Sequence, residues 1–315
     1  MVDSKHKWKA WLYLLPALVL LAVFTVYPIV NTIRLAFLED YNMMLAARGK
    51  VFEFGFKNFE MVVQYQGFLT CLKNTILLCV LTVPISTILA LLIAVALNSI
   101  KPLRRVLQTI YFLPYVTNSI AIGMVFAAMF NVVGNIASDP PLIETAGIIN
   151  NFLGLFGVEP INWINGGSSY WANMTVMVIY IVWNALPFKI LILLGGLQSV
   201  NKQYYDAAKV DGTSRARVLR KITVPLLSPM IAYVVITGFI GGFKEYSSIV
   251  GVFGEAMGPP GSVGMGQMNT MVGYIYDSLG GQHQGRASAA ALILFAIILA
   301  VTLINLQVSK KRVHY

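Results

Sequence analysis

Charged side chains are densest in one short polar stretch, residues 198–229, which lies between two long apolar segments. Asp206 and Asp211 stand there among six basic residues, which are Lys202, Lys209, Arg215, Arg217, Arg220 and Lys221. The charges in this stretch and the short helices predicted in it are what the rest of the sequence is interpreted around.

The spacing predicts two short helices joined by a tight turn. Asn201 can cap the first helix, and Gly212 ends it because glycine tolerates the left-handed conformation of a C-terminal cap. Thr213 or Ser214 can cap a second helix, which runs to about Ile222. We therefore expect a helix–turn–helix element that enters the next apolar segment at its C-terminal end.

Helices this short are marginal in water, because helix nucleation costs more than a few hydrogen bonds return. They must dock on another surface. Ala207 and Ala208 form a small, flat face that allows a close approach. Val218, Leu219 and Ile222 form an apolar stripe at helical spacing. The stretch is interpreted as a docking element that protrudes from a membrane domain.

This pattern resembles the EAA loop, the signature of permease subunits in binding-protein-dependent ABC importers. The matching positions are Asp206, Ala207, Ala208, Asp211, Gly212, Ile222, Pro225 and Pro229. The chain has Asp206 where the family has glutamate, Thr213 where it has a small residue, and Leu219 where it has phenylalanine. A basic cytoplasmic loop that follows topology rules would explain the charge but not the ordered spacing.

The resemblance implies that a cytosolic ATPase grips this loop. The residues expected to couple to the ATPase are Asp206, Ala207, Ala208, Asp211, Gly212, Leu219 and Ile222. The order of apolar segments along the chain is also similar to the carbohydrate branch of the family, of the maltose and glycerol-phosphate permease type.

Composition places the chain in a membrane. Hydrophobic residues make up 57% and charged residues 11% of the sequence, whereas soluble domains carry about 25% charged residues. The net charge of +10 gathers at the ends of apolar segments, which indicates membrane topology rather than nucleic-acid binding. Cys71 and Cys79 lie near one apolar segment and suggest neither a disulfide framework nor a metal site.

Six apolar segments are long enough to cross the hydrocarbon core, which needs about 20 helical residues. They span residues 11–37, 75–97, 106–130, 175–197, 226–253 and 287–308. Prolines interrupt the first at Pro16 and Pro28 and the third at Pro114. The first segment is too long for a signal peptide and is expected to be retained.

The expected fold is an all-α membrane protein with six transmembrane helices, and the resemblance implies the type I ABC importer permease fold. Residues 1–10 would form a cytoplasmic N-terminal tail. Residues 11–315 would form one polytopic permease domain, in which residues 198–229 are the cytoplasmic coupling loop.

Basic residues set the orientation. The loops on one side hold Arg48, Lys50, Lys57 and Arg286. The other side holds the six of the coupling loop together with Lys5, Lys7, Lys9, Lys101, Arg104, Arg105, Lys310, Lys311 and Arg312. Because cytoplasmic loops carry the excess of lysine and arginine, both termini and the coupling loop are expected in the cytoplasm.

No sequence of the form G-x-x-x-x-G-K-[ST] or H-E-x-x-H occurs, and no serine or threonine in the apolar segments has an adjacent histidine or carboxylate. The chain is therefore not expected to be an enzyme or to bind a cofactor. The resemblance implies that ATP and Mg²⁺ bind the partner ATPase.

Three charged residues intrude on the apolar segments, and ionisable groups in a membrane are functional candidates. Lys189 lies about 12 Å into its helix and Glu245 about 28 Å into the next, at 1.5 Å per residue, so different levels are expected. Lys189 either extends its head to the interface or lines a pathway. Lys244 and Glu245 either mark a helix end at the interface or contribute one pathway residue.

A neutral sugar is bound by hydrogen bonds and aromatic faces, and the two segments flanking the coupling loop supply both. In related sugar permeases these helices line the translocation path. The candidates here are Tyr180, Trp183, Asn184, Phe188, Thr237, Gly238, Gly241, Gly242 and Glu245. Aromatic residues in such segments also serve in packing or in interfacial belts.

The resemblance implies one half of the translocation pathway of an ATP-driven carbohydrate importer in the plasma or inner membrane of a prokaryote. Implied partners are a second permease subunit, two cytosolic ATPase subunits, membrane lipid and an extracytoplasmic solute-binding protein, which would contact residues 131–174 and 254–286. Alternatives are an ABC permease for a non-sugar solute, an ion-coupled secondary transporter or channel, and a membrane scaffold without transport.

Replacement of Gly212 tests the coupling loop. Gly212→Asp is expected to abolish transport and leave membrane insertion intact, because a Cβ strains the turn between the two short helices. Solute uptake and association with the ATPase are the measurements. Unchanged uptake with normal ATPase association would contradict the coupling role.

Overall fold

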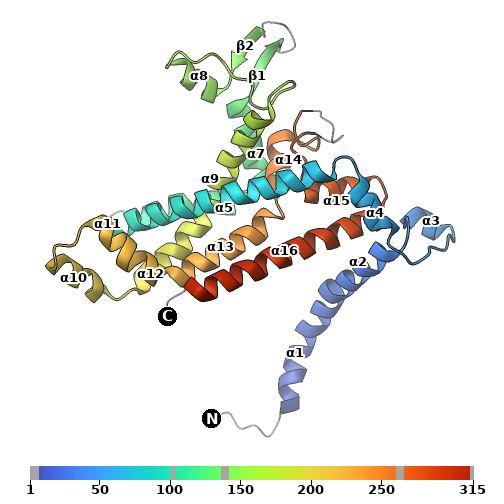
Figure 1. Cartoon of the computed structure of the whole chain (residues 1–315), viewed down its shortest axis with the longest axis horizontal. Coiled ribbons are helices and arrows are strands. Elements are labelled where there is room, and N and C mark those ends of the chain that lie inside the picture. The colour runs from blue at the N-terminus through green and yellow to red at the C-terminus, as the bar shows by residue number, and fades with distance from the viewer. Residues whose placement is uncertain (1–6, 101–103, 136–141, 260–265, 313–315) are drawn as a thin grey trace. The chain divides into compact units, whose positions relative to one another are not determined.

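The computed structural model describes residues 7–100, 104–135, 142–259 and 266–312, and most of them are helical (Figure 1). The residues predicted as one transmembrane domain divide into two compact units. The first unit comprises Met1–Tyr65 and Tyr274–Ile293, and the second comprises Gln66–Gly273 and Leu294–Tyr315. Residues 1–6 of the predicted tail and Lys101 lie outside the described residues.

The first predicted membrane segment is a continuous helical run of 27 residues, Trp11–Phe37. It consists of α1 (Lys7–Leu21), a π-helical segment η2 (Ala22–Val26) and α2 (Tyr27–Phe37). Pro16 lies inside α1, and Pro28 lies in the first turn of α2. A proline removes one backbone hydrogen-bond donor from a helix. The helical run nevertheless continues through both proline positions. The predicted interruptions are therefore wrong.

An ordered loop follows α2 in the first unit, with α3 (Met43–Ala47) and α4 (Lys57–Gln64). Asn58 is fully buried and donates to the carbonyl oxygens of Ala36 at 3.0 Å and Leu38 at 2.7 Å. Lys57 forms an ion pair with Asp40 at 2.7 Å, and the hydrogen bond and charge of Asp40 raise the pKa of Lys57 above its ordinary value. These contacts tie the loop to the end of α2.

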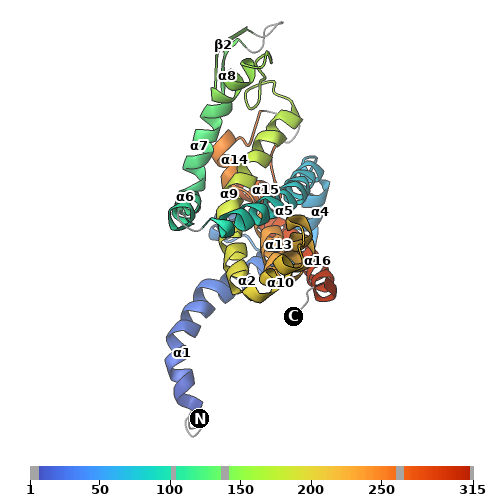
Figure 2. The same cartoon turned by 90° about the vertical axis from the view of Figure 1, so that its left-hand side faces the viewer.

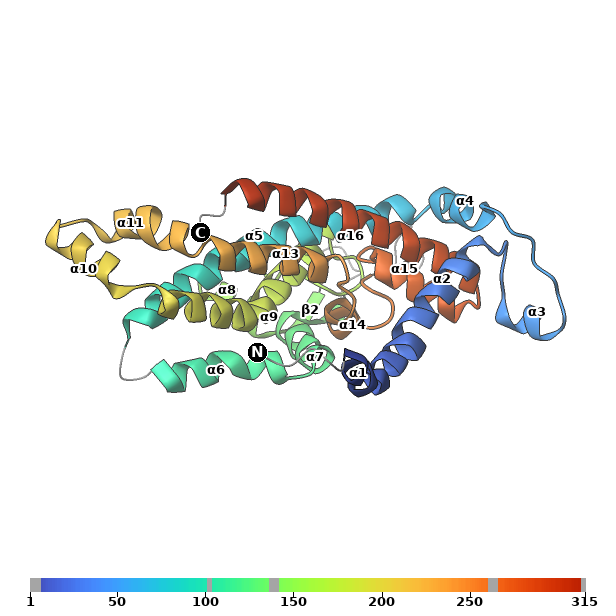
Figure 3. The ribbon, with the colours of Figure 1, turned by 90° about the horizontal axis from the view of Figure 1, so that it is seen from below.

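Three helices of the second unit pack side by side: α5 (Phe68–Ser99), α9 (Tyr170–Ser199) and α13 (Ser228–Gly242) (Figures 1 and 3). Small and aliphatic side chains fill the space between them, including Ala90, Ala94 and Leu193. The hydroxyls of Thr82 and Ser86 donate to carbonyl oxygens one turn earlier in α5, at 2.7 Å and 2.5 Å. Polar side chains are thus buried in α5 with their hydrogen bonds satisfied.

The third and fifth predicted segments are not straight helices. The third consists of α6 (Arg104–Val116) and α7 (Ser119–Phe130), which meet at 103°. The break is at Asn118, whose side chain caps α7 by accepting from the Ile120 N–H at 2.8 Å, and not at Pro114, which lies inside α6. The location predicted for this break is wrong.

The fifth segment, predicted as continuous over residues 226–253, is broken twice. It bends by 71° before α13, and α13 ends at Gly242, ahead of the separate short helix α14 (Ser247–Phe253). The glycines at the end of α13 explain the second break, because glycine is a poor helix former.

Within the described residues, four helices are long and apolar enough to cross a membrane by themselves. They are Trp11–Phe37, Phe68–Ser99, Tyr170–Ser199 and Gln284–Lys310, the last within α16 (Gln284–Arg312). The number rises to six if each bent pair counts as one span. The chain is therefore a multi-pass membrane protein.

Two of the predicted loops contain secondary structure. Residues 131–174 hold a two-stranded antiparallel sheet of β1 (Val132–Asn135) and β2 (Leu142–Ala146), followed by α8 (Ile148–Gly154). The all-α description is wrong at this hairpin. The glycine-rich residues 254–286 include α15 (Met271–Gly280), and Met257 and Met268 there are buried in the core of the second unit.

α7 and α14 pack with their backbones in close contact (Figure 2). A Cβ atom at Gly123 would lie 2.6 Å from the backbone of Gly251, and one at Gly251 would lie 2.9 Å from the carbonyl oxygen of Ile120. Only glycine at both positions permits this approach.

Gly123→Val is expected to push α7 away from α14 and destabilise the protein by about 1–3 kcal/mol, the usual cost of overpacking. The measurement is the Tm of the detergent-solubilised protein. Gly195→Val is the matched control, because a Cβ at Gly195 meets no atom within 4 Å. Equal Tm values for the two variants would contradict the close helix contact.

Candidate functional site

The first helix of the coupling loop is α10 (Lys202–Val210), as predicted. The Asn201 side chain caps it by accepting from the Gln203 N–H at 3.0 Å. After the helix, Gly212 has φ +61°, in the left-handed region, and the Thr213 N–H donates to the Ala208 carbonyl oxygen at 2.9 Å. The predicted cap and turn are both confirmed.

The second helix continues beyond its predicted end at Ile222. It runs through α11 (Arg215–Val218), the π-helical segment η3 (Leu219–Thr223) and α12 (Val224–Leu226). Pro225 lies in the first turn of α12, where proline is tolerated. The coupling loop therefore connects to α13 through helix and not through an open loop.

The loop exposes part of its predicted docking surface. Asp206, Ala207, Asp211 and Gly212 are exposed, whereas Ala208 is buried at 5% exposure. The expected face shared by both alanines is therefore wrong, because Ala208 packs inside the loop. The apolar stripe residues Leu219 and Ile222 are partly buried.

A cavity of about 720 Å³, here called the loop cavity, lies between the coupling loop and the C-terminal ends of α5 and α9. Asn98 and Leu197 line it from the long helices, and Tyr205, Gly212 and Arg215 line it from the loop. The Tyr205 hydroxyl is 3.4 Å from that of Thr223. α10 and α11 project beyond the ends of α9 and α13 in the second unit (Figure 3).

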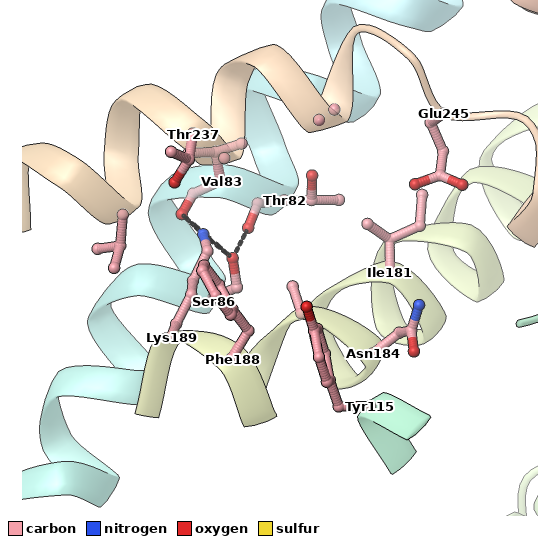
Figure 4. Close-up of a pocket in the computed structure, with 15 residues that line it drawn as sticks. Thr82, Val83, Ser86, Tyr115, Ile181, Asn184, Phe188, Lys189, Thr237 and Glu245 are labelled. Carbon is pink, nitrogen blue, oxygen red and sulfur yellow. Dashed lines mark hydrogen bonds between the residues drawn. The ribbon is translucent and has the colours of Figure 1, made fainter. Parts of the chain in front are cut away.

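A second cavity, of about 290 Å³ and here called the central cavity, lies among α5, α6, α9 and α13 (Figure 4). Seven predicted path residues line it: Asn184, Phe188, Thr237, Gly238, Gly241, Gly242 and Glu245. Residues chosen from two segments far apart in the sequence thus meet at one cavity.

The other two predicted path residues lie elsewhere. Tyr180 is fully buried, and its hydroxyl donates to the Ser119 carbonyl oxygen at 2.6 Å. Trp183 packs with its ring centroid 5.4 Å from that of Phe126 in α7. Neither side chain belongs to the lining of the central cavity.

Thr82, Ser86 and Tyr115 were not among the predicted path residues, yet they line the central cavity from α5 and α6. Tyr115 stacks on Phe188, with ring centroids 5.8 Å apart and an interplanar angle of 18°. The spacing of four between Thr82 and Ser86 places both on one helix face, and this signal was present in the sequence.

Lys189 turns toward α5 and does not extend to the interface. It is 4% exposed, and its Nζ donates to Ser86 Oγ at 2.7 Å, Thr87 Oγ1 at 3.0 Å and the Val83 carbonyl oxygen at 3.2 Å (Figure 4). A Cβ atom at Gly238 would lie 3.2 Å from this Nζ. The side chain lines the central cavity, which excludes the snorkelling interpretation.

Glu245 lies in the turn between α13 and α14 and also lines the central cavity. Its Oε1 accepts from the Ser248 N–H at 3.2 Å. Lys244 beside it is exposed. Of this adjacent pair, only Glu245 faces the cavity, in agreement with the expectation that at most one residue does so.

Residues 77–314 match the model of the family described as binding-protein-dependent transport system inner membrane component. The chain belongs to this family. The predicted relationship is confirmed, and the chain is a transport component of a membrane rather than an enzyme.

The sequences of named relatives align with nearly the whole chain. The arabinooligosaccharides transport system permease protein AraP of Bacillus subtilis is 30% identical over 301 residues, 95% of this chain and 88% of that protein. The lactose transport system permease protein LacF of Rhizobium radiobacter is 29% identical over 299 residues, 94% of this chain and 91% of that protein.

A solved structure shares the fold. A chain of a bacterial alginate ABC transporter, in complex with an alginate pentasaccharide-bound periplasmic protein, superimposes with a TM-score of 0.77. The match has 21% identity and covers 98% of this chain and 96% of that chain. The chain therefore shares the fold of that transporter chain.

The contact of α5 with α13 beside the central cavity is testable by cross-linking. A Cβ at Gly242 would lie 2.8 Å from Cys79 Sγ and 3.5 Å from Cys79 Cβ, within the range of a disulfide. Gly242→Cys is expected to cross-link to Cys79 under mild oxidation, measured by mass spectrometry of peptides. Gly241→Cys is the control, because a Cβ there meets no atom within 4 Å. Equal cross-linking of both variants would contradict this helix arrangement.

Proposed function

We propose that the chain is one of two permease subunits of an ATP-driven importer and forms half of the translocation pathway for a sugar or oligosaccharide. The relatives support the solute class, since their names cite arabinooligosaccharides, lactose and alginate. The stacked Tyr115 and Phe188 rings and the amide of Asn184 supply the aromatic face and hydrogen-bonding groups that a sugar needs.

The observation that carries the proposal is the tight, hydrogen-bonded turn at Gly212. The two helices it joins are exposed along Asp206, Ala207 and Asp211, and they lead directly into the helices that line the central cavity. A partner that grips this loop moves α9 and α13 together. We assign the contact with the ATPase to these exposed residues and to Leu219 and Ile222.

In the proposed cycle, ATP and Mg²⁺ bound to two cytosolic ATPase subunits supply the energy. A second permease subunit completes the pathway, and an extracytoplasmic solute-binding protein delivers the sugar. Six spans with both termini in the cytoplasm place the basic coupling loop on the side of the ATPase. Each state must make different contacts with the partners, because only differential interactions shift a conformational equilibrium.

The proposal is tested by purifying the tagged chain from its native membrane. An ATPase, a second permease and saccharide-dependent ATP hydrolysis are expected in the purified complex. Gly212→Val is expected to abolish this hydrolysis, since a β-branched side chain strains a left-handed residue. A lone chain that transports solute with an ion gradient would instead identify a secondary carrier.

Gly157→Val is the matched control for Gly212→Val. Gly157 also has a positive φ, +77°, and a Cβ there meets no atom within 4 Å. It lies in residues 131–174, away from the coupling loop. Equal loss of hydrolysis in both variants would show that backbone strain alone, and not coupling, is responsible.

A further inference from the structure

The central cavity carries one charged side chain on α9 and one in the turn before α14. Among the described residues, the charged side chains that line this cavity are Lys189 and Glu245. Figure 4 shows Glu245 on the other side of Tyr115 from Lys189. Any solute in this cavity therefore meets a cationic end and an acidic end.

The positive charge of Lys189 has no ionic partner in the part of the chain that the structure describes. Its Nζ donates to two hydroxyls and one carbonyl, all uncharged, and no carboxylate lies within 4.0 Å of it. A buried charge without a counter-charge is costly, so an anionic group entering the cavity gains from its presence.

One of the three N–H donors of Lys189 can change its hydrogen-bond partner. The Val83 carbonyl oxygen, which accepts from it at 3.2 Å, also accepts from Thr87 Oγ1 at 2.7 Å. If the lysine turns away, the Thr87 hydroxyl still donates to that oxygen. Nζ can therefore turn one proton to a solute while Ser86 and Thr87 still hold it.

The other side chains that line the cavity can orient a sugar relative to the charge of Lys189. The ring of Phe188, stacked on Tyr115, provides an apolar face one residue before Lys189. The Glu245 carboxylate accepts from the Ser248 N–H, and a carboxylate has about four acceptor positions, so it can also accept from a sugar hydroxyl. A carboxylate at the Glu245 end is repelled, and one at the Lys189 end is attracted.

We propose that the central cavity selects an acidic saccharide, with its carboxylate beside Lys189, its ring against Phe188 and its hydroxyls toward Glu245. This inference rests on the proposed function and adds the charge of the solute. The family relationship does not decide that charge, because the names of its relatives and structural neighbours include both lactose and the acidic polysaccharide alginate.

The test measures binding of two probes, digalacturonate and its dimethyl ester, to the complete importer complex in lipid nanodiscs without the solute-binding protein. Isothermal titration calorimetry gives both Kd values. The wild-type complex is expected to prefer the acid by about tenfold or more, as for a hydrogen bond to a charged group. Lys189→Met is expected to remove this preference.

Three further variants separate charge recognition from folding. Lys189→Arg is expected to keep the preference for the acid, and Glu245→Gln is expected to keep or increase it. Lys244→Met removes an exposed lysine that does not line the cavity, and both affinities should stay unchanged.

Equal affinities for the two probes in the wild-type complex, binding of neither probe, or equal weakening of both by Lys189→Met would overturn the inference. The presence of the ATPase and second permease is scored in the same preparations. If the complex is complete but binds both probes equally, only this inference is refuted. If the chain purifies without an ATPase and a second permease, the proposed function is refuted.

Discussion

The hydrogen bonds between Lys189 and α5 determine which faces of the long helices border the central cavity. In hydrocarbon, each unsatisfied polar group costs several kcal/mol, so polar side chains must find partners inside the protein. Ser86 and Thr87 donate to carbonyl oxygens of their own helix and accept from the Lys189 ammonium group. This arrangement turns the polar face of α5 toward α9, and the tightly packed residues Ala90 and Leu193 hold the same two helices together one to two turns away.

The coupling loop is attached to α9 at one end and to α13 at the other. α9 leads into it at Ser199, and η3 and α12 lead from it into α13 through a bend of 71°. Because the turn at Gly212 is short, the connection to α13 is helical, and only Val200 and Asn201 separate α9 from α10, the proposed movement of the loop would be transmitted to both helices. The loop cavity beneath it leaves room for such a displacement.

Local signals predicted local structure well. The Asn201 cap and the Gly212 turn depend on neighbouring residues, and the structure confirms both. The bends at Asn118 and after Gly242 were missed, because apolar composition is the same in a straight helix and in a bent one. The hairpin of β1 and β2 was missed in a stretch that sequence analysis treated as a loop.

The predicted residues that line the central cavity come only from α9, from α13 and from the turn after α13. Phe188, Gly242 and their neighbours were found because both segments flank the coupling loop. Ser86 and Tyr115 come from α5 and α6, and their approach depends on tertiary packing that apolar periodicity does not encode.

Gly238 is the feature with the widest consequence. A Cβ there would lie 3.1 Å from Val83 Cγ1 and 3.2 Å from Lys189 Nζ, so the ammonium group occupies the volume that a side chain on α13 would otherwise fill. Side-chain volume at positions 189 and 238 is therefore shared between two helices. A shorter side chain at 189 would relieve only one of the two contacts, because Val83 Cγ1 on α5 would still lie 3.1 Å from the added Cβ, so three helices together fix the glycine.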